Sequence, residues 1–456
     1  MSLPIVACAL LLTALASSQF VDGCYTSIFA FGDSFSDTGN YISLTSNGLL
    51  QYDGIPSCSV PPYGETFFHH PTGRCSDGRV IIDFIAEQFG LPLVPPYSGG
   101  RKANRGGGGV NFAVVGAPAL TEDVLQSNGS YSRDNISMMS QINMFKSLLQ
   151  SICKTSSCDE IFDKSLIVFG PFGGDDYASA ILSKRVEDAL RLQPLVINAV
   201  ASGIEKLKFS ARNSAQSQLL SFSRLTASIP VEVAERRCEI RSSGMAELSR
   251  NSRLCSSKSE ENMSTLVADP KLIGRATADL KVAPQLQTAV EEARSLKSSP
   301  PLLELLLSKL EARHKEDYDP ITGCLTWLNE FAQKHNGLLR KELTRIQELY
   351  PNVSITYADY YNAGLELFLS PKKYGFNDES RLIACCGSGG PYNVDDDAKC
   401  GYPSSHACDD PSSYIQWDGA HLTQAAYQWI AKGLLSGLYT SPNITASCSS
   451  TSAKWI

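Results

Sequence analysis

The side chains best suited to do chemistry in this sequence lie near its two ends. An apolar, strand-like run begins at Ser27, breaks at Gly32 and delivers Ser34. A serine hydroxyl is a poor nucleophile until a base takes its proton, so it needs a sharp turn for exposure and a histidine from elsewhere in the fold. Asp418 precedes His421 by three residues, close enough for its carboxylate to fix the tautomer of the ring while the other ring nitrogen faces the serine. The pattern predicts one nucleophilic site built from both ends of the chain.

Strands and helices that alternate along the chain must bring these ends together. Apolar residues at helical spacing predict helices over 80–90, 139–152, 195–207, 328–349 and 423–439. Short apolar runs rich in β-formers predict strands over 110–112, 165–170 and 353–359. Such alternation favours a parallel sheet covered on both faces. The glycine run 106–109 lacks the lysine and hydroxyl residue of a phosphate-binding loop, so we interpret it as a flexible linker.

Several stretches, in the same order along the chain, resemble one enzyme family. The run 31–40, which contains Gly-Asp-Ser, resembles the first sequence block of the plant GDSL esterase/lipases, members of the SGNH hydrolase superfamily. The Asp418-x-x-His421 block resembles the last one, and the run 385–393 resembles a stretch typical of the plant branch. A lone Gly-Asp-Ser is usually only a turn, but blocks in family order make the resemblance specific.

The resemblance covers residues 24 to about 207 and about 317 to 440. It implies a three-layer α/β/α SGNH-hydrolase fold with a mostly parallel sheet, in a single domain over 24–440. It also implies hydrolysis of carboxylic esters through an acyl-enzyme, with Ser34 as nucleophile, His421 as general base and then acid, and Asp418 as the group that orients the histidine. No metal or organic cofactor is needed for this chemistry.

The resemblance further implies an oxyanion hole, in which this chain departs from its family. The backbone N–H groups of Ser34 and Gly116 would hold the oxyanion, although a glycine after a strand is equally often a packing residue. The family's third donor is the Asn of a Gly-x-Asn-Asp block, where this chain has Asp175. An ionised carboxylate can only accept hydrogen bonds. Since deleting one such donor costs about 100- to 1,000-fold in turnover, we expect Asp175 to reduce activity.

A second departure lies at residues 208–316. After the helix at 195–207 the family continues into a further strand and a Pro-x-Gly-Cys-x-Pro loop, which this sequence lacks. The segment is instead rich in Ser, and its aromatic residues are Phe209 and Phe222. By the family's strand order the missing strand would lie inside the sheet, where its loss exposes two rows of backbone polar groups.

Two interpretations of this atypical segment stay open. Altered splicing or a translated intron would leave the interior strand missing or replaced, with 229–233 as the only passable stand-in and its Pro230 unable to donate to a ladder. A genuine insertion would place helices from 285 to 313 over the sheet. Sequencing the transcript across both junctions decides between them.

The N-terminus predicts secretion. The apolar run from Leu3 to Ala16 is too short to span a bilayer and is followed by small residues, so residues 1–22 are interpreted as a signal peptide, with a buried first helix as the alternative. We expect an extracellular protein, with the vacuole as the alternative, and no stable membrane anchor. Five tripeptides match the acceptor pattern for N-glycans, at Asn128, Asn135, Asn262, Asn352 and Asn443.

Composition agrees with a secreted protein that does not bind nucleic acid. The 456 residues carry a formal net charge of -7 and no run of Lys and Arg. Fourteen cysteines are many for a cytosolic enzyme, and removing Cys8 with the signal leaves an odd number. The cysteines between 385 and 408, with His406, follow no common zinc spacing, so disulfides are favoured over a metal site.

Three functions fit these residues. The first is a secreted esterase or lipase acting on a small-molecule ester, and the lack of a long apolar lid-like segment favours small soluble esters. The second is an SGNH-fold glycoprotein that binds ligands, or a non-productive isoform, because Asp175 and the segment 208–316 both disfavour catalysis. The third is acyl transfer to an alcohol, which uses the same residues.

Overall fold

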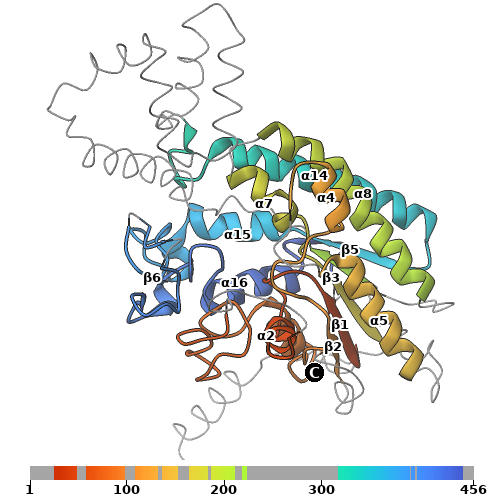
Figure 1. Cartoon of the computed structure of the whole chain (residues 1–456), viewed down its shortest axis with the longest axis horizontal. Helices are drawn as coiled ribbons and strands as arrows, with labels where there is room; N and C mark the ends of the chain where they lie inside the picture. Colours follow the sequence, from red (N-terminus) through yellow and green to blue (C-terminus); the bar gives the residue numbers. More distant parts are fainter. Residues whose placement is uncertain are drawn as a thin grey trace, which may run out of the picture. The chain divides into compact units, whose positions relative to one another are not determined.

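The sheet brings the carboxyl ends of the predicted strands to one edge. The computed structural model describes residues 25–48, 58–97, 108–131, 136–152, 164–182, 186–210, 218–222, 317–390, 392–395 and 398–444. Within them one sheet has the order β2 (Gly108–Asn111), β1 (Ser27–Phe31), β3 (Ser165–Phe169), β4 (Gln218–Phe222), β5 (Ser354–Ala358) and β8 (Thr440–Ser441). All neighbouring pairs are parallel except β5 and β8, which are antiparallel. Figure 1 labels β1, β2, β3 and β5 of this sheet. The mostly parallel sheet is therefore as predicted.

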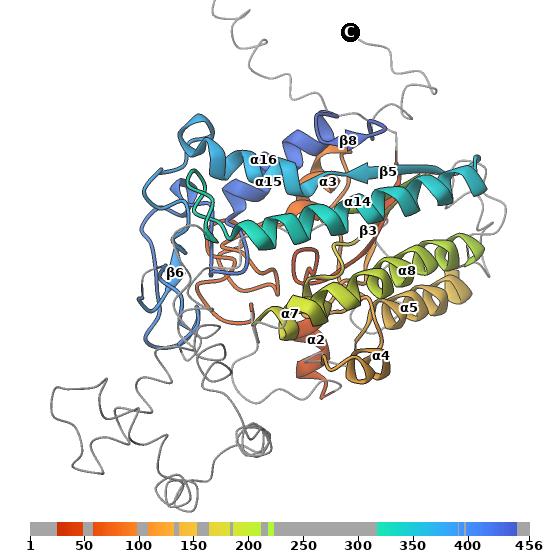
Figure 2. The ribbon, with the colours of Figure 1, turned by 90° about the horizontal axis from the view of Figure 1, so that it is seen from above.

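Helices cover both faces of this sheet because its central strands are apolar on both sides. In β1, Phe29 and Phe31 join one core cluster, whereas Ile28 and Ala30 join the other. The first cluster lies under α4 (Glu122–Ser127), α5 (Met138–Ile152), α7 (Gly174–Leu182), α8 (Val186–Ser210) and α14 (Thr326–Leu349). The second lies under α3 (Ile81–Gln88), α15 (Tyr360–Leu369) and α16 (Gln424–Leu435). Figure 2 shows α5, α8 and α14 side by side. The predicted three-layer α/β/α fold is confirmed.

Shorter elements complete the described chain. They are α2 (Asn40–Ser46), the 3₁₀ turns η2 (Pro371–Tyr374) and η3 (Pro411–Ser413), and a small ladder of β6 (Cys386–Gly387) with β7 (His406–Ala407). All the described elements belong to the unit formed by residues 1–232 and 317–456. The predicted signal peptide 1–22 and the predicted helices at 285–313 lie outside the described residues.

The interior strand expected to be missing has a replacement. Strand β4 (218–222) pairs in parallel with β3 on one side and with β5 on the other. Its backbone supplies the partners that the two flanking strands would otherwise lack, so the sheet is continuous across this position. The stand-in proposed from the sequence, 229–233, lies outside the described residues. Pattern alone missed β4 because five residues inside a Ser-rich segment give too short a periodic signal.

The prediction that the glycine run 106–109 is a flexible linker was partly wrong. Its last two residues, Gly108 and Gly109, open strand β2 and pair with Ser27 and Ile28 of β1. A side chain at Gly109 would meet the Ile28 carbonyl oxygen at 1.8 Å, and its φ of +102° also favours glycine. Close backbone approach explains these two glycines. The first two residues of the run, 106–107, lie outside the described residues.

The cysteines between 385 and 408 form disulfides, as predicted. The bridges within the described chain are Cys58–Cys75, Cys385–Cys408 and Cys386–Cys400. Cys324 is a buried free thiol, and burial raises its pKa. The odd count expected from the sequence stays a prediction, because seven of the fourteen cysteines lie outside the described residues.

The predicted glycan acceptors differ in exposure. Asn352 is exposed in the turn before β5, whereas Asn128 and Asn443 are half-buried. Asn135 and Asn262 lie outside the described residues. Glycosylation stays a prediction at all five positions.

Glycine at position 109 should be essential for stability. We expect Gly109→Ala to lower the free energy of unfolding by about 2 kcal/mol or more, because the added methyl group collides with the backbone of β1. The matched control is Gly337→Ala in α14, where a methyl group meets no atom within 4 Å and should raise stability by about 0.5 to 1 kcal/mol. Thermal unfolding measures both, and an unchanged midpoint for Gly109→Ala would contradict the close approach.

Candidate active site

The turn that carries Ser34 follows β1 and is held against the end of β3. A side chain at Gly32 would meet the carbonyl oxygen of Gly170 at 2.7 Å, so only glycine fits there. The Gln141 amide, from α5, pairs with both backbone groups of Gly32: its Oε1 accepts the N–H at 3.0 Å, and its Nε2 donates to the carbonyl at 2.7 Å. Ser36 Oγ donates to the Gly170 carbonyl at 3.0 Å. The turn is therefore fixed on both sides of the serine.

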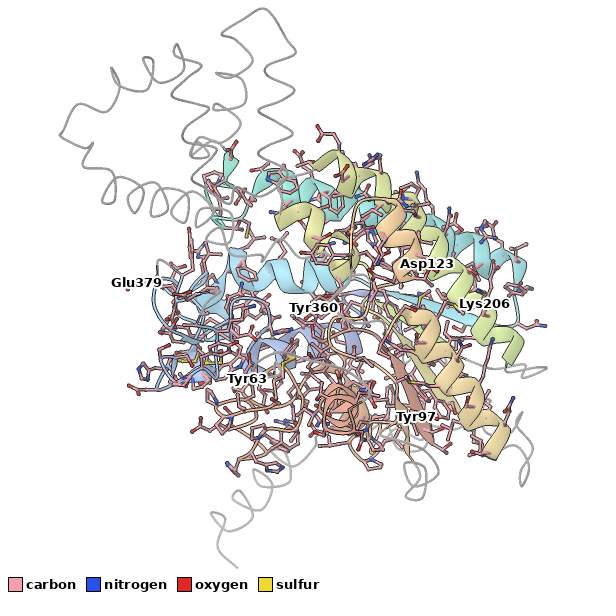
Figure 3. All side chains as sticks on the ribbon, in the orientation of Figure 1. Tyr63, Tyr97, Asp123, Lys206, Tyr360 and Glu379 are labelled. Carbon is pink, nitrogen blue, oxygen red and sulfur yellow. A yellow bond between two sulfur atoms is a disulfide. The ribbon has the colours of Figure 1, made fainter. Side chains whose placement is uncertain are left out.

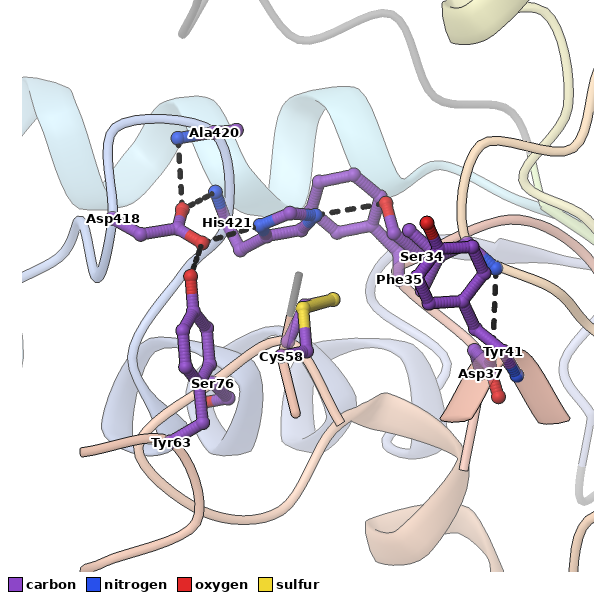
Figure 4. Close-up of a disulfide and its surroundings, with 12 residues drawn as sticks. Ser34, Phe35, Asp37, Tyr41, Cys58, Tyr63, Ser76, Asp418, Ala420 and His421 are labelled. Carbon is purple, nitrogen blue, oxygen red and sulfur yellow. Dashed lines mark hydrogen bonds and ion pairs between the residues drawn. A yellow bond between two sulfur atoms is a disulfide. The ribbon is translucent and has the colours of Figure 1, made fainter. Parts of the chain in front are cut away.

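The three residues predicted to do the chemistry lie together. His421 Nε2 is 2.8 Å from Ser34 Oγ, and His421 Nδ1 is 2.7 Å from Asp418 Oδ2 (Figure 4). The Phe35 ring packs against the imidazole, with ring centroids 4.8 Å apart. Contacts on both ring nitrogens and on one face hold the imidazole in a single orientation. In this geometry the carboxylate accepts Nδ1–H and leaves Nε2 free to take the serine proton.

The Asp418 carboxylate is saturated with hydrogen bonds. Oδ1 accepts the backbone N–H groups of Ala420 at 3.0 Å and His421 at 2.7 Å, while Oδ2 accepts the Tyr63 hydroxyl at 2.8 Å besides the imidazole. Burial by itself would raise the pKa of Asp418. The charge of His421 and the hydrogen bonds from His421 and Tyr63 outweigh it and hold this pKa well below its usual range. The carboxylate therefore stays ionised beside the imidazole.

The disulfide-bonded loop supports the segment that ends in Asp418. The N–H of Cys385 donates to the Gln416 carbonyl at 3.0 Å, and that of Cys386 donates to the Trp417 carbonyl at 2.7 Å. The Trp417 N–H donates to the His421 carbonyl at 2.8 Å, which closes the turn between them. Two disulfides thus brace a backbone that positions the carboxylate and the imidazole.

The loop with Gly116 is tied to the serine turn. The Val114 N–H donates to the Gly32 carbonyl at 3.1 Å, and the Val115 N–H donates to Asp37 Oδ2 at 3.0 Å. Within the part of the chain that the structure describes, the N–H groups of Ser34 and Gly116 have no acceptor. Two backbone donors without acceptors, one in the Ser34 turn and one in a loop tied to it, are groups that an oxyanion hole would need.

Asp175 lies in the first turn of α7, next to a buried carboxylate. Asp176 accepts the backbone N–H groups of Ala119 at 2.8 Å and Leu120 at 2.9 Å, which ties α7 to the loop after β2. Burial raises the pKa of Asp176 to about 7, and the negative charge of Asp175 acts in the same direction. Asp175 itself is half-buried. Asp176 therefore supports the backbone, and Asp175 adds a second negative charge beside it at the start of α7.

Sequence reasoning missed two side chains that hold the site. Gln141 sits on a helix predicted correctly, but its contact with Gly32 spans 109 positions and leaves no local pattern. Tyr63 follows two prolines in a turn-rich loop, where an aromatic residue gives no signal of its own. His335, expected to be a tolerated surface or core residue, is a core residue: it contacts the Tyr177 hydroxyl at 2.9 Å, and burial lowers its pKa to about 4.

Comparison with known proteins agrees with this geometry. Residues 28–434 match the family model described as GDSL-like lipase/acylhydrolase. Two GDSL esterase/lipases of Arabidopsis thaliana are 39% and 38% identical over 433 and 441 residues, covering 94% and 96% of this chain and 90% and 91% of theirs. A sinapine esterase of Brassica napus is 37% identical over 438 residues, covering 95% of this chain and 91% of its own.

The chain therefore belongs to the GDSL-like lipase/acylhydrolase family, as its sequence blocks indicated, and is a carboxylic ester hydrolase by class. Among the described helices, none combines the length and apolar character needed to cross a bilayer. No cluster of His, Cys, Asp and Glu suited to a metal ion occurs among the described residues.

Two buried carboxylates predict that stability falls as pH rises. Burial raises the pKa of Asp37 to about 6 and that of Asp176 to about 7, so the folded chain holds these protons more tightly than the unfolded chain does. Their contribution to stability is complete below about pH 4 and is lost as pH rises through about pH 7. We expect a higher urea midpoint and a larger free energy of unfolding near pH 5 than near pH 7.5, with about 1.4 kcal/mol for each pH unit over which a carboxyl is protonated in the folded chain alone.

The control for this pH effect is a pair of variants. Asp37→Asn should be less stable overall but should lose the share of the pH dependence that comes from Asp37. Asp123→Asn, at an exposed position, should keep the wild-type dependence. A wild-type midpoint that rises from about pH 5 to about pH 7.5 would contradict the direction of both pKa shifts.

Proposed function

We propose that this protein is a secreted serine esterase that works through an acyl-enzyme on Ser34. His421 takes the hydroxyl proton as Ser34 Oγ attacks the ester carbonyl, and it then gives that proton to the leaving alcohol. Asp418 orients the imidazole and stabilises its charged form. Water, activated by the same His421, then hydrolyses the acyl-serine. The observation that carries this proposal is the continuous contact from Ser34 Oγ through His421 to Asp418, at 2.8 and 2.7 Å.

The oxyanion would be held by the backbone N–H groups of Ser34 and Gly116. Support comes from the absence of any other acceptor for either group among the described residues. Asp175 would stand where the family has its third donor, and there its carboxylate would oppose the developing negative charge. Activity is therefore expected to be lower than with an asparagine at this position.

Secretion and the kind of ester belong to the same proposal. The predicted signal at 1–22 and the disulfides support export, since bridges persist in oxidising compartments. Small soluble esters are the proposed substrate class. Because one relative is named a sinapine esterase, sinapine is a reasonable first compound to try. Acyl transfer to an alcohol uses the same residues, and an acceptor-alcohol competition during turnover distinguishes it from hydrolysis.

Labelling with a fluorophosphonate tests whether the nucleophile is assembled. This reagent modifies an activated serine, so the secreted wild-type protein should be labelled at Ser34 and the Ser34→Ala variant should not. Mass spectrometry of the modified peptide locates the label. If secreted, soluble wild-type protein remains unlabelled, the esterase proposal fails and a ligand-binding or non-productive chain takes its place.

Replacing Asp175 tests the oxyanion hole. We expect Asp175→Asn to raise kcat on a small ester by about 10- to 1,000-fold, because an amide donates where the carboxylate repels. The matched control is Asp123→Asn, which removes an acidic group from the first turn of α4 (Figure 3) and should leave kcat unchanged. Equal kcat for Asp175→Asn and wild type would show that Asp175 is not part of the oxyanion hole.

A further inference from the structure

Tyr63 contacts the carboxylate that orients the candidate base. Its hydroxyl donates to Asp418 Oδ2 at 2.8 Å, and the same oxygen receives Nδ1–H of His421 at 2.7 Å. Figure 4 shows the Tyr63 ring reaching Asp418 from the side opposite to Ala420. In the described part of the chain, His421 and Tyr63 are the titratable side chains that act on Asp418.

We infer that Tyr63 is a positioning residue for ester hydrolysis, whose hydroxyl holds the Asp418 carboxylate in the orientation that fixes His421. The inference rests on the proposed function, since it assigns Tyr63 a part in catalysis by Ser34. A hydrogen bond to an ionised carboxylate stabilises the charged form. It also draws negative charge from Oδ2, so the proton shared with the imidazole stays on Nδ1. Tyr63 therefore acts through Asp418 and touches no reacting atom.

The hydroxyl of Tyr63 can serve only as a donor in this place. Burial, and then the charge of Asp418, raise the pKa of Tyr63 well above its ordinary value. The phenol therefore stays protonated at every pH at which an esterase works. Its ring lies edge-on to Trp417, with centroids 6.0 Å apart, and only 5% of the residue is exposed. The donor is therefore largely shielded from solvent.

The loop that carries Tyr63 is also fixed by contacts within itself. The Cys58–Cys75 disulfide joins its two ends. The N–H of Gly64 donates to the Ser76 carbonyl at 3.0 Å. A side chain at Gly64, whose φ is +77°, would meet a backbone oxygen at 2.2 Å. These constraints fix the backbone of the loop, so the orientation of Tyr63 does not depend on its hydrogen bond to Asp418 alone.

The same loop also forms hydrogen bonds with the segment that follows His421. Ser76 Oγ donates to the Leu422 carbonyl at 3.1 Å, and Asp77 Oδ1 accepts the Gln424 N–H at 2.6 Å at the start of α16. Residue 63 therefore contacts the turn before His421, while residues 76–77 contact the segment after it. Holding the turn from both sides is what a positioning role requires, and a core tyrosine would need no such arrangement.

The test is Tyr63→Phe, which keeps the ring and removes the hydroxyl. Loss of a hydrogen bond to a charged group should lower kcat about 10-fold, with KM little changed. Asp418 would then carry more of its charge next to the imidazole and would stabilise the imidazolium. The acid limb of the kcat/KM profile should therefore move to higher pH, by about 0.5.

The matched control is Tyr361→Phe. Tyr361 is also 5% exposed, and its hydroxyl hydrogen-bonds with Asn329 and Gln333, away from Ser34. Tyr361→Phe should lower the free energy of unfolding without shifting the pH profile of kcat/KM. A double-mutant cycle with Asp418→Asn gives a second measurement: if Tyr63 acts through Asp418, Tyr63→Phe should have no further effect on kcat in that background.

The outcomes separate this inference from the function on which it rests. Fluorophosphonate labelling of wild type at Ser34, with slower labelling and a shifted acid limb in Tyr63→Phe, supports both. Normal labelling of wild type with an unchanged kcat and profile in Tyr63→Phe overturns only the role of Tyr63. An additive double-mutant cycle also overturns it, whereas unlabelled wild type overturns the proposed function itself.

Discussion

The buried carboxylate of Asp37 is the interaction on which the candidate site most depends. It accepts four backbone N–H groups: those of Gly39 and Asn40 at 2.7 Å, that of Tyr41 at 3.1 Å and that of Val115 at 3.0 Å. Three of these start α2 and one lies in the loop that carries Gly116. A carboxylate suits this place because it only accepts and offers about four lone-pair directions. Without it, four buried donors would lack partners and the two loops would separate.

Much of the fold could be predicted from local pattern. Periodic apolar residues located α3, α5 and α14 to within a few positions, because one buried helical face repeats over several turns. Elements defined by distant partners were not predictable. Strand β4 depends on two neighbours that pair with its backbone, and β8 is a two-residue edge strand against β5. We interpreted the glycines of β2 as a linker because the sequence does not show that β1 lies against them.

The candidate reacting side chains could be picked out from the sequence, whereas the side chains that hold them could not. Ser34, Asp418 and His421 stand in blocks whose residue types and spacing are constrained by chemistry. Tyr63 and Gln141 are constrained instead by where the chain passes in space: each contacts a residue more than a hundred positions away. Sequence alone does not show what these residues do. Tyrosine is common in loops and glutamine is common on amphipathic helices, whatever their role. Only coordinates distinguish such ordinary occurrences from a role beside the serine.

The separation of 387 positions between Ser34 and His421 has a consequence for biosynthesis. During translation the serine emerges early and can enter the growing sheet, but its base is made last. A nascent chain therefore carries the proposed nucleophile before its proposed base has been made. The candidate site can assemble only after synthesis of the chain reaches α16, which packs against α3. The order of the chain thus delays assembly of the candidate site until translation is almost complete.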